Sequence, residues 1–128
     1  MELNYPVSRA KEGKAEVVVP DLEKFRKDVW DYAPSKAPVF FNPAMRLNRD
    51  LAVLVLQAHQ RRTNKELIIS EPLAGCGVRG IRFAKEVEGV SEIYLNDINP
   101  EACRMAKHNV ELNAVSGIVR LFNLDANL

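Results

Sequence analysis

Glu71-Pro72-Leu73-Ala74-Gly75-Cys76-Gly77-Val78-Arg79-Gly80 is the stretch of this chain that decides its fold. It follows a short β-prone run, Leu67-Ile68-Ile69, and a helical pattern begins near Val78. A second β-prone run, Ile93-Tyr94-Leu95, ends at Asn96-Asp97. A strand, a glycine turn, a helix and a strand ending in an acid are typical of half of a nucleotide-binding α/β domain. Glycines let the backbone approach a ligand closely, and the amides of the following helix face its charge.

The composition is that of an ordinary globular protein. With 128 residues the chain is long enough for one modest domain with its own core. The net charge is +1, from 18 basic and 17 acidic residues, so the charge balance neither requires nor excludes a nucleic-acid partner.

Neither a membrane nor a metal is indicated. The longest apolar run, Leu51 to Leu56, is far too short to span a bilayer, and the first residues lack the pattern of a secretory signal. Cys76 and Cys103 are widely separated and have no metal-ligand spacing. We therefore expect no membrane partner, no bound metal and a reduced, cytoplasmic setting.

The chain divides into two regions at about residue 41. Residues 1–41 form an N-terminal β and loop extension, with a turn at Lys11 to Lys14, a strand from Ala15 to Val19 and one or two helical turns within Leu22 to Trp30. Residues 42–128 form the cofactor-binding Rossmann-like region. The pair Asn42-Pro43 starts a helix that should run to about His59. Its helical periodicity is carried by Leu47, Leu51, Leu54 and Val55.

From Leu67 onward the pattern is strand, helix, strand, helix, strand. Asn99-Pro100 repeats the helix-start signal, and this helix should run to about Leu112. Its apolar stripe consists of Ala102, Met105, Ala106 and Val110. A third strand covers residues 118–123. This alternation predicts an α/β fold with a parallel sheet, truncated after the third core strand. Because doubly wound domains have roughly five to seven strands, we expect a fragment, or a chain that needs a partner to complete the sheet.

The glycine turn alone leaves two ligand classes open. Gly75, Gly77 and Gly80 match G-x-G-x-x-G, which occurs in dinucleotide-binding proteins, but Glu71 and Pro72 separate the strand from the glycines. An acid at the end of each of two strands suits S-adenosylmethionine better, because this cofactor has an amino group, a sulfonium and a ribose but no phosphate. Glu71 would contact its amino group or cap the next helix.

Several blocks of the chain resemble the tRNA guanine-N2 dimethyltransferase family, class I S-adenosylmethionine-dependent enzymes that modify guanosine 26 of tRNA. The resemblance covers nearly the whole chain in the same order. The blocks are Glu12-Gly13-Lys14-Ala15, Val39-Phe40-Phe41-Asn42-Pro43, Asn48-Arg49-Asp50, Gly77-Val78-Arg79-Gly80-Ile81-Arg82-Phe83, Asn96-Asp97-Ile98 and Asp125-Ala126-Asn127.

The resemblance implies a role for each matching residue. Asp97 would accept hydrogen bonds from the cofactor ribose, and Asp125 with the backbone of Ala126 would hold the adenine edge. Arg49 and Arg79 match cofactor-contacting arginines, and an arginine can bind a carboxylate through paired hydrogen bonds. Phe40 matches an aromatic residue that stacks on the target base.

The resemblance also implies a limit. The family's acid-proline-aromatic motif, which contacts the reactive nitrogen, would lie beyond Leu128. We therefore assign no catalytic residue within the chain, and we expect it to bind cofactor and tRNA with little methyl transfer of its own. Two alternatives are a non-catalytic module that binds cofactor or a partner chain, and a dinucleotide-binding oxidoreductase half-domain.

A basic-aromatic pattern occurs near the N-terminus, formed by Lys24, Arg26, Lys27 and Trp30. A solvated helix face is the favoured interpretation of this pattern over an RNA contact.

Overall fold

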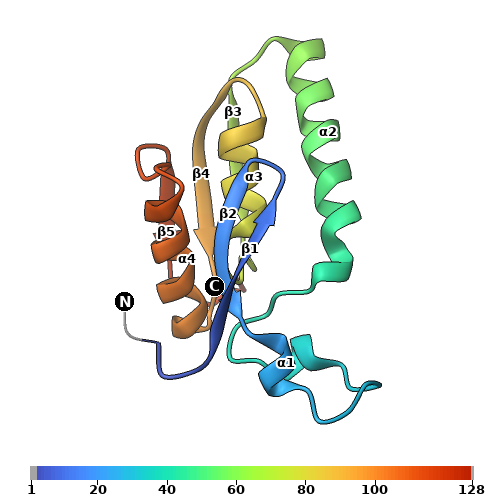
Figure 1. Ribbon diagram of the computed structural model, residues 1–128. Coiled ribbons are helices and arrows are strands. Elements are labelled where there is room, and N and C mark those ends of the chain that lie inside the picture. Colours follow the sequence, from blue (N-terminus) through green and yellow to red (C-terminus); the bar gives the residue numbers. More distant parts are fainter. Residues whose placement is uncertain (1–2, 128) are drawn as a thin grey trace.

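Three parallel strands form the centre of the molecule, flanked by helices and an N-terminal hairpin (Figure 1). The structure is a computed structural model that describes residues 3–127. In chain order the elements are β1 (Val7–Glu12), β2 (Ala15–Pro20), α1 (Leu22–Phe25), η1 (Ala33–Ser35), η2 (Pro43–Met45), α2 (Arg46–Thr63), β3 (Leu67–Glu71), α3 (Val78–Glu86), β4 (Val90–Asn96), α4 (Pro100–Leu112) and β5 (Val119–Phe122).

The sheet confirms the predicted α/β architecture. Its strand order is β3-β4-β5, and both pairings are parallel. In register, Ile69 lies opposite Ile93, which lies opposite Val119. Ile93 and Leu95 of the central strand are fully buried, as expected for a strand with a neighbour on each side.

Both Asn-Pro pairs start helical structure: Asn99-Pro100 starts α4 directly, and Asn42-Pro43 starts the 3-10 turn η2, after which α2 begins at Arg46. Asn42 Oδ1 accepts a hydrogen bond from Ala44 N at 3.0 Å, and Asn99 Oδ1 accepts one from Glu101 N at 3.0 Å. The stripe predicted for α4 is buried, from 0% exposure at Met105 to 3% at Val110. α2 continues one turn beyond the predicted end near His59 and stops at Asn64, which adopts the left-handed conformation with φ 51°.

The N-terminal hairpin contains a strand that the sequence analysis did not predict. β1 pairs antiparallel with β2 from Val7↔Pro20 to Glu12↔Ala15, and the turn uses Gly13 at φ +54°. Most side chains of β1 are exposed, so its sequence lacks the apolar alternation that identifies a strand.

Two asparagines of α4 attach the hairpin to the domain. Asn109 Oδ1 accepts a hydrogen bond from Val18 N at 2.7 Å, and its Nδ2 donates to Val18 O at 2.9 Å. Asn113 makes the equivalent pair with the backbone of Glu16, at 3.1 and 2.7 Å. These side chains satisfy backbone groups of β2 that no further strand pairs with.

The helix expected within Leu22 to Trp30 is short and ends at Phe25. After Phe25, aspartate side chains accept hydrogen bonds from backbone N–H groups that a longer helix would have used. Asp31 Oδ2 accepts from Lys27 N at 2.9 Å, and Asp28 Oδ1 accepts from Trp30 N at 2.8 Å. Such local side-chain acceptors compete with helical hydrogen bonds, so the chain turns away instead of extending α1.

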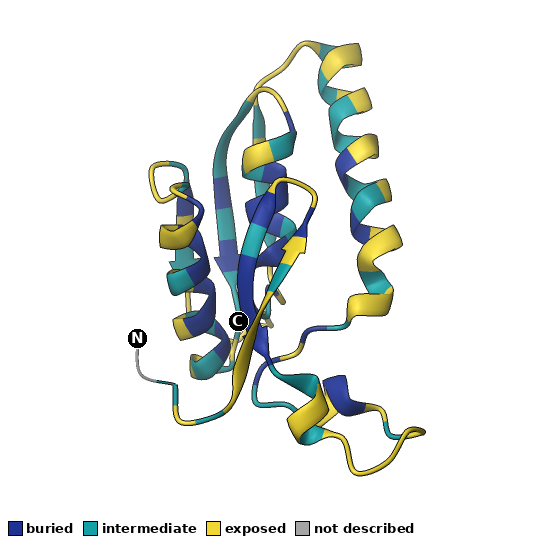
Figure 2. Ribbon diagram, in the orientation of Figure 1, coloured by how far each residue is buried: buried dark blue, intermediate teal, exposed yellow. Residues whose placement is uncertain are grey.

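The apolar stripe of α2 faces solvent (Figure 2). Its members Leu47, Leu51, Leu54 and Val55 are 53–68% exposed, whereas Arg49 and Val53 are the buried residues of this helix. β3 alternates between half-buried and exposed positions, with Ile68 at 68% exposure. Within residues 3–127, no helix has the length and hydropathy needed to cross a membrane.

Candidate functional site

The glycine turn between β3 and α3 requires small residues for its own packing. Gly75 and Gly77 have φ of +55° and +81°, a region that side-chain-bearing residues rarely adopt. A Cβ on Gly75 would lie 3.0 Å from the backbone oxygen of Phe40, and one on Gly80 would lie 2.4 Å from Cδ2 of the fully buried Leu95. The turn therefore holds the segment before α2 and β4 close to the start of α3.

Asp97 connects the end of β4 to this turn. Its Oδ2 accepts a hydrogen bond from Gly75 N at 2.8 Å, and its Oδ1 accepts one from Asn99 N at 2.9 Å. Each carboxylate oxygen retains one further acceptor position, because an ionised carboxylate has about four in total. Asp97 therefore orders the turn and still has room for hydroxyl donors from a ligand.

A pocket of about 260 Å³ lies over the turn and collects most of the predicted site residues. Six of them line it: Phe40, Arg49, Glu71, Gly75, Arg79 and Asp97. Gly77 lies beneath the pocket as the N-cap of α3 and does not line it. Residues from four separate parts of the chain thus converge at the carboxyl edge of the sheet: the segment before α2, α2 itself, the β3–α3 region and the end of β4.

Asp125 and Ala126 lie outside this pocket. Both are exposed on the segment after β5, where Asp125 Oδ1 accepts a hydrogen bond from Asn127 N at 2.9 Å, which lowers the pKa of its carboxyl. The start of this segment is held at the same edge of the sheet, since Asn96 Oδ1 accepts from Leu124 N at 3.0 Å. Asp125 and Ala126 therefore follow a strand that ends at the same edge of the sheet as the pocket, but they do not form part of the pocket wall.

Arg49 enters the pocket from a buried ion-pair network. Its Nε and Nη2 donate to the two carboxylate oxygens of Glu12 at 2.7 and 2.8 Å, and Nη2 also donates to Asn42 O at 3.1 Å. The guanidinium lies over the ring of Phe41, 5.3 Å from its centroid. Its Nη1 makes no hydrogen bond to any of residues 3–127, so this donor pair is available to a ligand.

Glu12 is a site-supporting residue that the sequence analysis did not assign. It is 4% exposed and also accepts a hydrogen bond from Nη1 of Arg82 at 3.0 Å. Burial alone would raise the pKa of Glu12, but the hydrogen bonds and charges of Arg49 and Arg82 outweigh it and leave the pKa below its usual value. The sequence contained one indication of its importance, the family block Glu12-Gly13-Lys14-Ala15. The residues beside Glu12, Lys11 and Gly13, gave no reason to expect its burial.

Glu71 is the most perturbed carboxyl of the pocket. Burial raises its pKa to about 7, although the charge of Arg79 and the Gly80 N–H act in the opposite direction. Gly80 N donates to Glu71 Oε2 at 3.2 Å, and Arg79 Nε lies 3.6 Å from Oε1. Both functions left open for Glu71 are thus compatible with its position, since it binds the first turn of α3 and also lines the pocket.

Arg79 and Cys76 have different parts in the pocket. Arg79 is partly exposed, and its Nη2 donates to Asn48 Oδ1 at 2.8 Å, which ties α3 to α2. Cys76 is 1% exposed, and burial raises the pKa of its thiol to about 11, so the thiol stays protonated and serves packing. The opening is therefore lined by two arginines, two carboxylates and the half-exposed ring of Phe40.

Comparison with known proteins identifies the family. The family model for N2,N2-dimethylguanosine tRNA methyltransferase matches residues 13–128. A tRNA (guanine(26)-N(2))-dimethyltransferase of Methanobrevibacter smithii is 36% identical over 124 residues, which cover 97% of this chain and 30% of the relative. The enzyme of the same name from Methanothermobacter thermautotrophicus is 44% identical over 105 residues, 82% of this chain and 26% of the relative.

Two solved structures are similar to this chain, one in sequence and fold and one in fold alone. Trm1 from Pyrococcus horikoshii, solved with S-adenosyl-L-methionine, is 37% identical with a TM-score of 0.64, over 83% of this chain and 24% of that one. The complex of aTrm5 with tRNALeu is similar in fold alone, at 20% identity and a TM-score of 0.71, over 99% of this chain and 30% of that one. The chain spans about 30% of the length of the curated relatives that it matches. It belongs to the N2,N2-dimethylguanosine tRNA methyltransferase family.

Proposed function

We propose that this chain is the cofactor-binding N-terminal part of a tRNA guanine-N2 dimethyltransferase that acts on guanosine 26. The observation that carries the proposal is the hydrogen bond between Gly75 N and Asp97 Oδ2, which joins the glycine turn to the second-strand acid. Arg49, Glu71 and Arg79 surround this pair in one pocket. The names of the relatives supply the reaction, and the S-adenosyl-L-methionine in the Pyrococcus horikoshii structure supplies the cofactor.

The chemistry of the pocket fits S-adenosylmethionine. The free acceptor positions of Asp97 suit the ribose hydroxyls, and the free Nη1 of Arg49 suits the carboxylate of the methionine part. Ionised Glu71 would attract the positively charged amino group. The residues Glu71 and Pro72 between the strand and the glycines disfavour the dinucleotide alternative, in which the glycines follow the strand almost at once.

The remaining residues extend the site on either side. Asp125 and the backbone of Ala126 would hold the adenine edge, on the segment that Asn96 anchors beside the site. Phe40 is 48% exposed at the pocket rim and would stack on the target guanine. Gly75 and Gly77 have no side chain that would hold the ligand away from the backbone of the turn.

When bound, the cofactor supplies a sulfonium methyl group that passes to the exocyclic N2 of guanine, which loses a proton, and the transfer occurs twice. The residues of this chain hold and orient the two reactants. Among residues 3–127 we assign no group that takes up the N2 proton.

Calorimetric titration with S-adenosylhomocysteine and with NAD tests the cofactor class. We expect binding of the first only. Asp97→Ala should weaken it at least about 30-fold, because ribose hydroxyls lose a charged acceptor and Gly75 N–H loses its partner. Glu111→Ala, which removes an exposed carboxylate from α4, is the control and should leave the affinity unchanged. Binding of NAD without S-adenosylhomocysteine would refute the proposal.

Low turnover of the chain alone is expected both for the proposed function and for the alternative of a non-catalytic module. Incubation of the chain with unmodified tRNA and methyl-labelled cofactor should give little or no labelled tRNA, because the chain lacks an assigned proton acceptor. Sustained labelling would show that the chain contains its own catalytic group.

We also propose that further polypeptide, from the same protein or a partner, completes the sheet beside β3. Two features support this: β3 pairs on one edge only, and the apolar stripe of α2 is exposed. A cytoplasmic setting is part of the proposal, supported by the free thiols of Cys76 and Cys103.

A further inference from the structure

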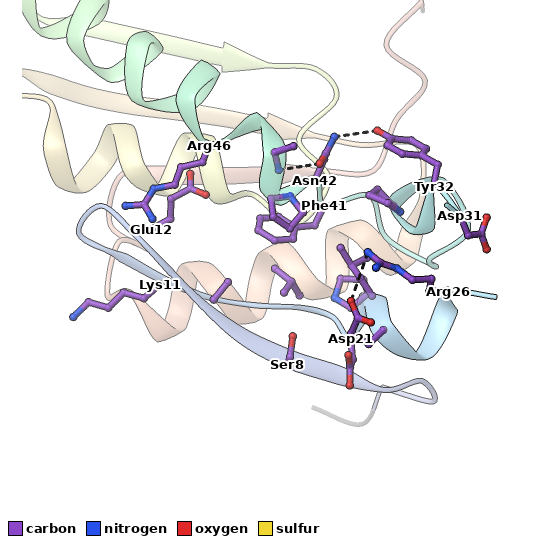
Figure 3. A pocket seen from close by; sticks show the side chains of 18 residues that line it. Ser8, Lys11, Glu12, Asp21, Arg26, Asp31, Tyr32, Phe41, Asn42 and Arg46 are labelled. Carbon is purple, nitrogen blue, oxygen red and sulfur yellow. Dashed lines mark hydrogen bonds and ion pairs between the residues drawn. The ribbon is translucent and has the colours of Figure 1, made fainter. Parts of the chain in front are cut away.

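A second and larger pocket, of about 630 Å³, lies between the N-terminal hairpin, α1 and the start of α2 (Figure 3). Its volume falls within the range of small-molecule and nucleotide sites. Phe41 and Asn42 line both this pocket and the cofactor pocket, so one wall separates the two. We call it the N-terminal pocket, and no function described above uses it.

Of two exposed aromatic side chains on the segment after α1, Tyr32 lines the N-terminal pocket and Trp30 lies outside its lining. Tyr32 is 54% exposed, and its hydroxyl accepts a hydrogen bond from Asn42 Nδ2 at 3.1 Å, directly on the shared wall. Trp30 precedes Tyr32 by two residues and is 93% exposed, so its ring is free of packing within the chain. The hydrogen bonds of Asp28 and Asp31 to the backbone hold this segment in a defined turn. Exposed rings on an ordered turn are suited to stacking on bases.

Positively charged side chains lie on both sides of the N-terminal pocket. Arg26 lies beside Tyr32, and Lys11 and Arg46 lie at the opposite side (Figure 3). Their existing ion pairs are weak: Arg26 is 3.6 Å from Glu23, Arg46 is 4.0 Å from Asp50, and all four side chains are well exposed. Arg26 and Arg46 can therefore exchange these ion pairs for contacts with phosphate groups at little cost in free energy.

The acids of the N-terminal pocket are mostly neutralised. Glu12 is shared by two buried arginines, Asp31 is paired with Lys36, and the exposed Glu23 is paired with Arg26. Asp21 has no ion-pair partner among the residues that the structure describes, and it is placed to accept N–H donors of a base. The interior is thus close to neutral with a cationic rim, which suits a nucleotide better than a free anion.

We propose that the N-terminal pocket binds unpaired RNA nucleotides that flank the target guanosine, with Trp30 and Tyr32 stacking on bases and Lys11, Arg26 and Arg46 facing phosphates. The inference rests on the proposed function, because the wall formed by Phe41 and Asn42 places such nucleotides next to a base at Phe40. It replaces the interpretation of Arg26 and Trp30 as part of a solvated helix face, since α1 ends before both.

Trp30 is the only tryptophan of the chain, so its fluorescence reports directly on stacking. The probe is an unpaired five-nucleotide RNA, compared with the same RNA annealed to its complement. We expect saturable quenching by the single strand and at least tenfold weaker binding of the duplex, whose bases are already stacked. Absence of quenching by the single strand, or equal binding of both forms, would overturn the proposal.

Substitutions separate stacking from general electrostatic attraction, measured by anisotropy of a fluorescein-labelled RNA. Trp30→Ala should weaken binding about 5- to 100-fold, and Trp30→Phe should restore most of it. Arg26→Ala should also reduce the dependence of log K on log salt by about 0.7. Arg62→Ala, at the far end of α2, is the control for Arg26→Ala. If the two arginine variants are equally affected, or if Trp30→Ala binds like the unaltered chain, the proposal is wrong.

Titration of the same samples with S-adenosylhomocysteine keeps the two proposals distinguishable. Loss of RNA binding with retained S-adenosylhomocysteine binding refutes the N-terminal pocket alone. RNA binding without S-adenosylhomocysteine binding refutes the proposed function and leaves an RNA site.

Discussion

An Asn-Pro pair precedes both α2 and α4, and both helices have an apolar stripe, yet the protein uses the two stripes in opposite ways. α4 buries its stripe under the hairpin and against the sheet, with Met105 at 0% exposure. α2 exposes its stripe and instead buries the guanidinium of Arg49, paired with Glu12. Periodicity therefore predicts that a helix forms, but the surrounding elements decide which face is covered.

The comparison extends to how each helix is held. α4 is attached by apolar packing and by the neutral hydrogen bonds of Asn109 and Asn113 to β2. α2 is attached largely through charge: Arg82 on α3 bridges Glu12 and Asp50, at 3.0 and 2.6 Å. Asp50 lies on α2 next to Arg49, so one buried network joins the hairpin, α2 and α3 to the wall of the cofactor pocket.

The largest effect should come from breaking this network. Glu12→Ala leaves Arg49 and Arg82 buried without their shared carboxylate, and we expect a loss of about 3–5 kcal/mol in the free energy of unfolding. Urea denaturation measures it. Glu16→Ala is the matched control on the same hairpin. Its pair with Arg9 is exposed, so the loss there should stay below about 1 kcal/mol. Equal losses in the two variants would show that α2 is not held by charge.

Apolar packing under α4 should be nearly as sensitive. Met105→Ala creates a cavity in the core and should cost about 2–5 kcal/mol, measured by the same denaturation. Met105→Leu, which nearly conserves volume, should cost less than about 1.5 kcal/mol. A small effect of Met105→Ala would mean that the core around α4 collapses to fill the space.

The sequence predicted the part of the fold that local signals encode. β3, β4 and β5, both capped helices and the α4 stripe follow from apolar runs and Asn-Pro pairs, and all are present. β1 was not predicted because its side chains face solvent. Of the one or two helical turns predicted within Leu22 to Trp30, α1 forms one, because Asp28 and Asp31 accept hydrogen bonds from the backbone donors that follow it. Periodicity in α2 could not reveal its exposure, since burial depends on elements distant in the chain.

The site follows the same division. Gly75, Glu71, Arg79 and Asp97 lie within one β-α-β unit, so the sequence alone brought them together, and the pocket contains all four. Glu12 could not be assigned from the sequence, because its contact with Arg49 spans 37 positions and depends on how the hairpin packs. Asp125 and Ala126 follow β5 as predicted, but they lie outside the pocket lining. The cofactor roles of all these residues, and the base-stacking role of Phe40, stay predictions.

The cofactor pocket should also add a pH dependence that is opposite in sign to that of Glu12 in the hairpin, whose pKa is lowered. The pKa of Glu71 is about 7 in the folded chain, above its ordinary value of 4.5. Between these values the folded state keeps a proton that the unfolded state has lost, so the free energy of unfolding falls as pH rises, by about 3 kcal/mol in total. Glu71→Gln should remove this component, seen as a difference between the two curves of stability against pH from 4 to 8. Parallel curves would show that Glu71 is not desolvated.

The same residue should couple pH to ligand binding. If the cofactor amino group lies against Glu71, binding favours the ionised carboxylate, and S-adenosylhomocysteine should release up to one proton near pH 6. Calorimetry in buffers of different ionisation enthalpy counts that proton, and Glu71→Gln should abolish the release. Unchanged proton release in Glu71→Gln would assign it to another group and limit Glu71 to its bond with Gly80 N.

The smallest effect should come from the exposed stripe of α2, and it is the sharpest test of the contrast with α4. Leu54 is 65% exposed, and glutamine has a helix propensity close to that of leucine, so Leu54→Gln should change the free energy of unfolding by no more than about 0.5 kcal/mol. A loss above about 1.5 kcal/mol that grows with protein concentration would mean that a second copy covers the stripe in solution, and sedimentation velocity of both forms would show the dimer. In that event α2 and α4 would obey the same rule, each burying its apolar face, and the difference between them would lie only in whether the covering element belongs to the same chain.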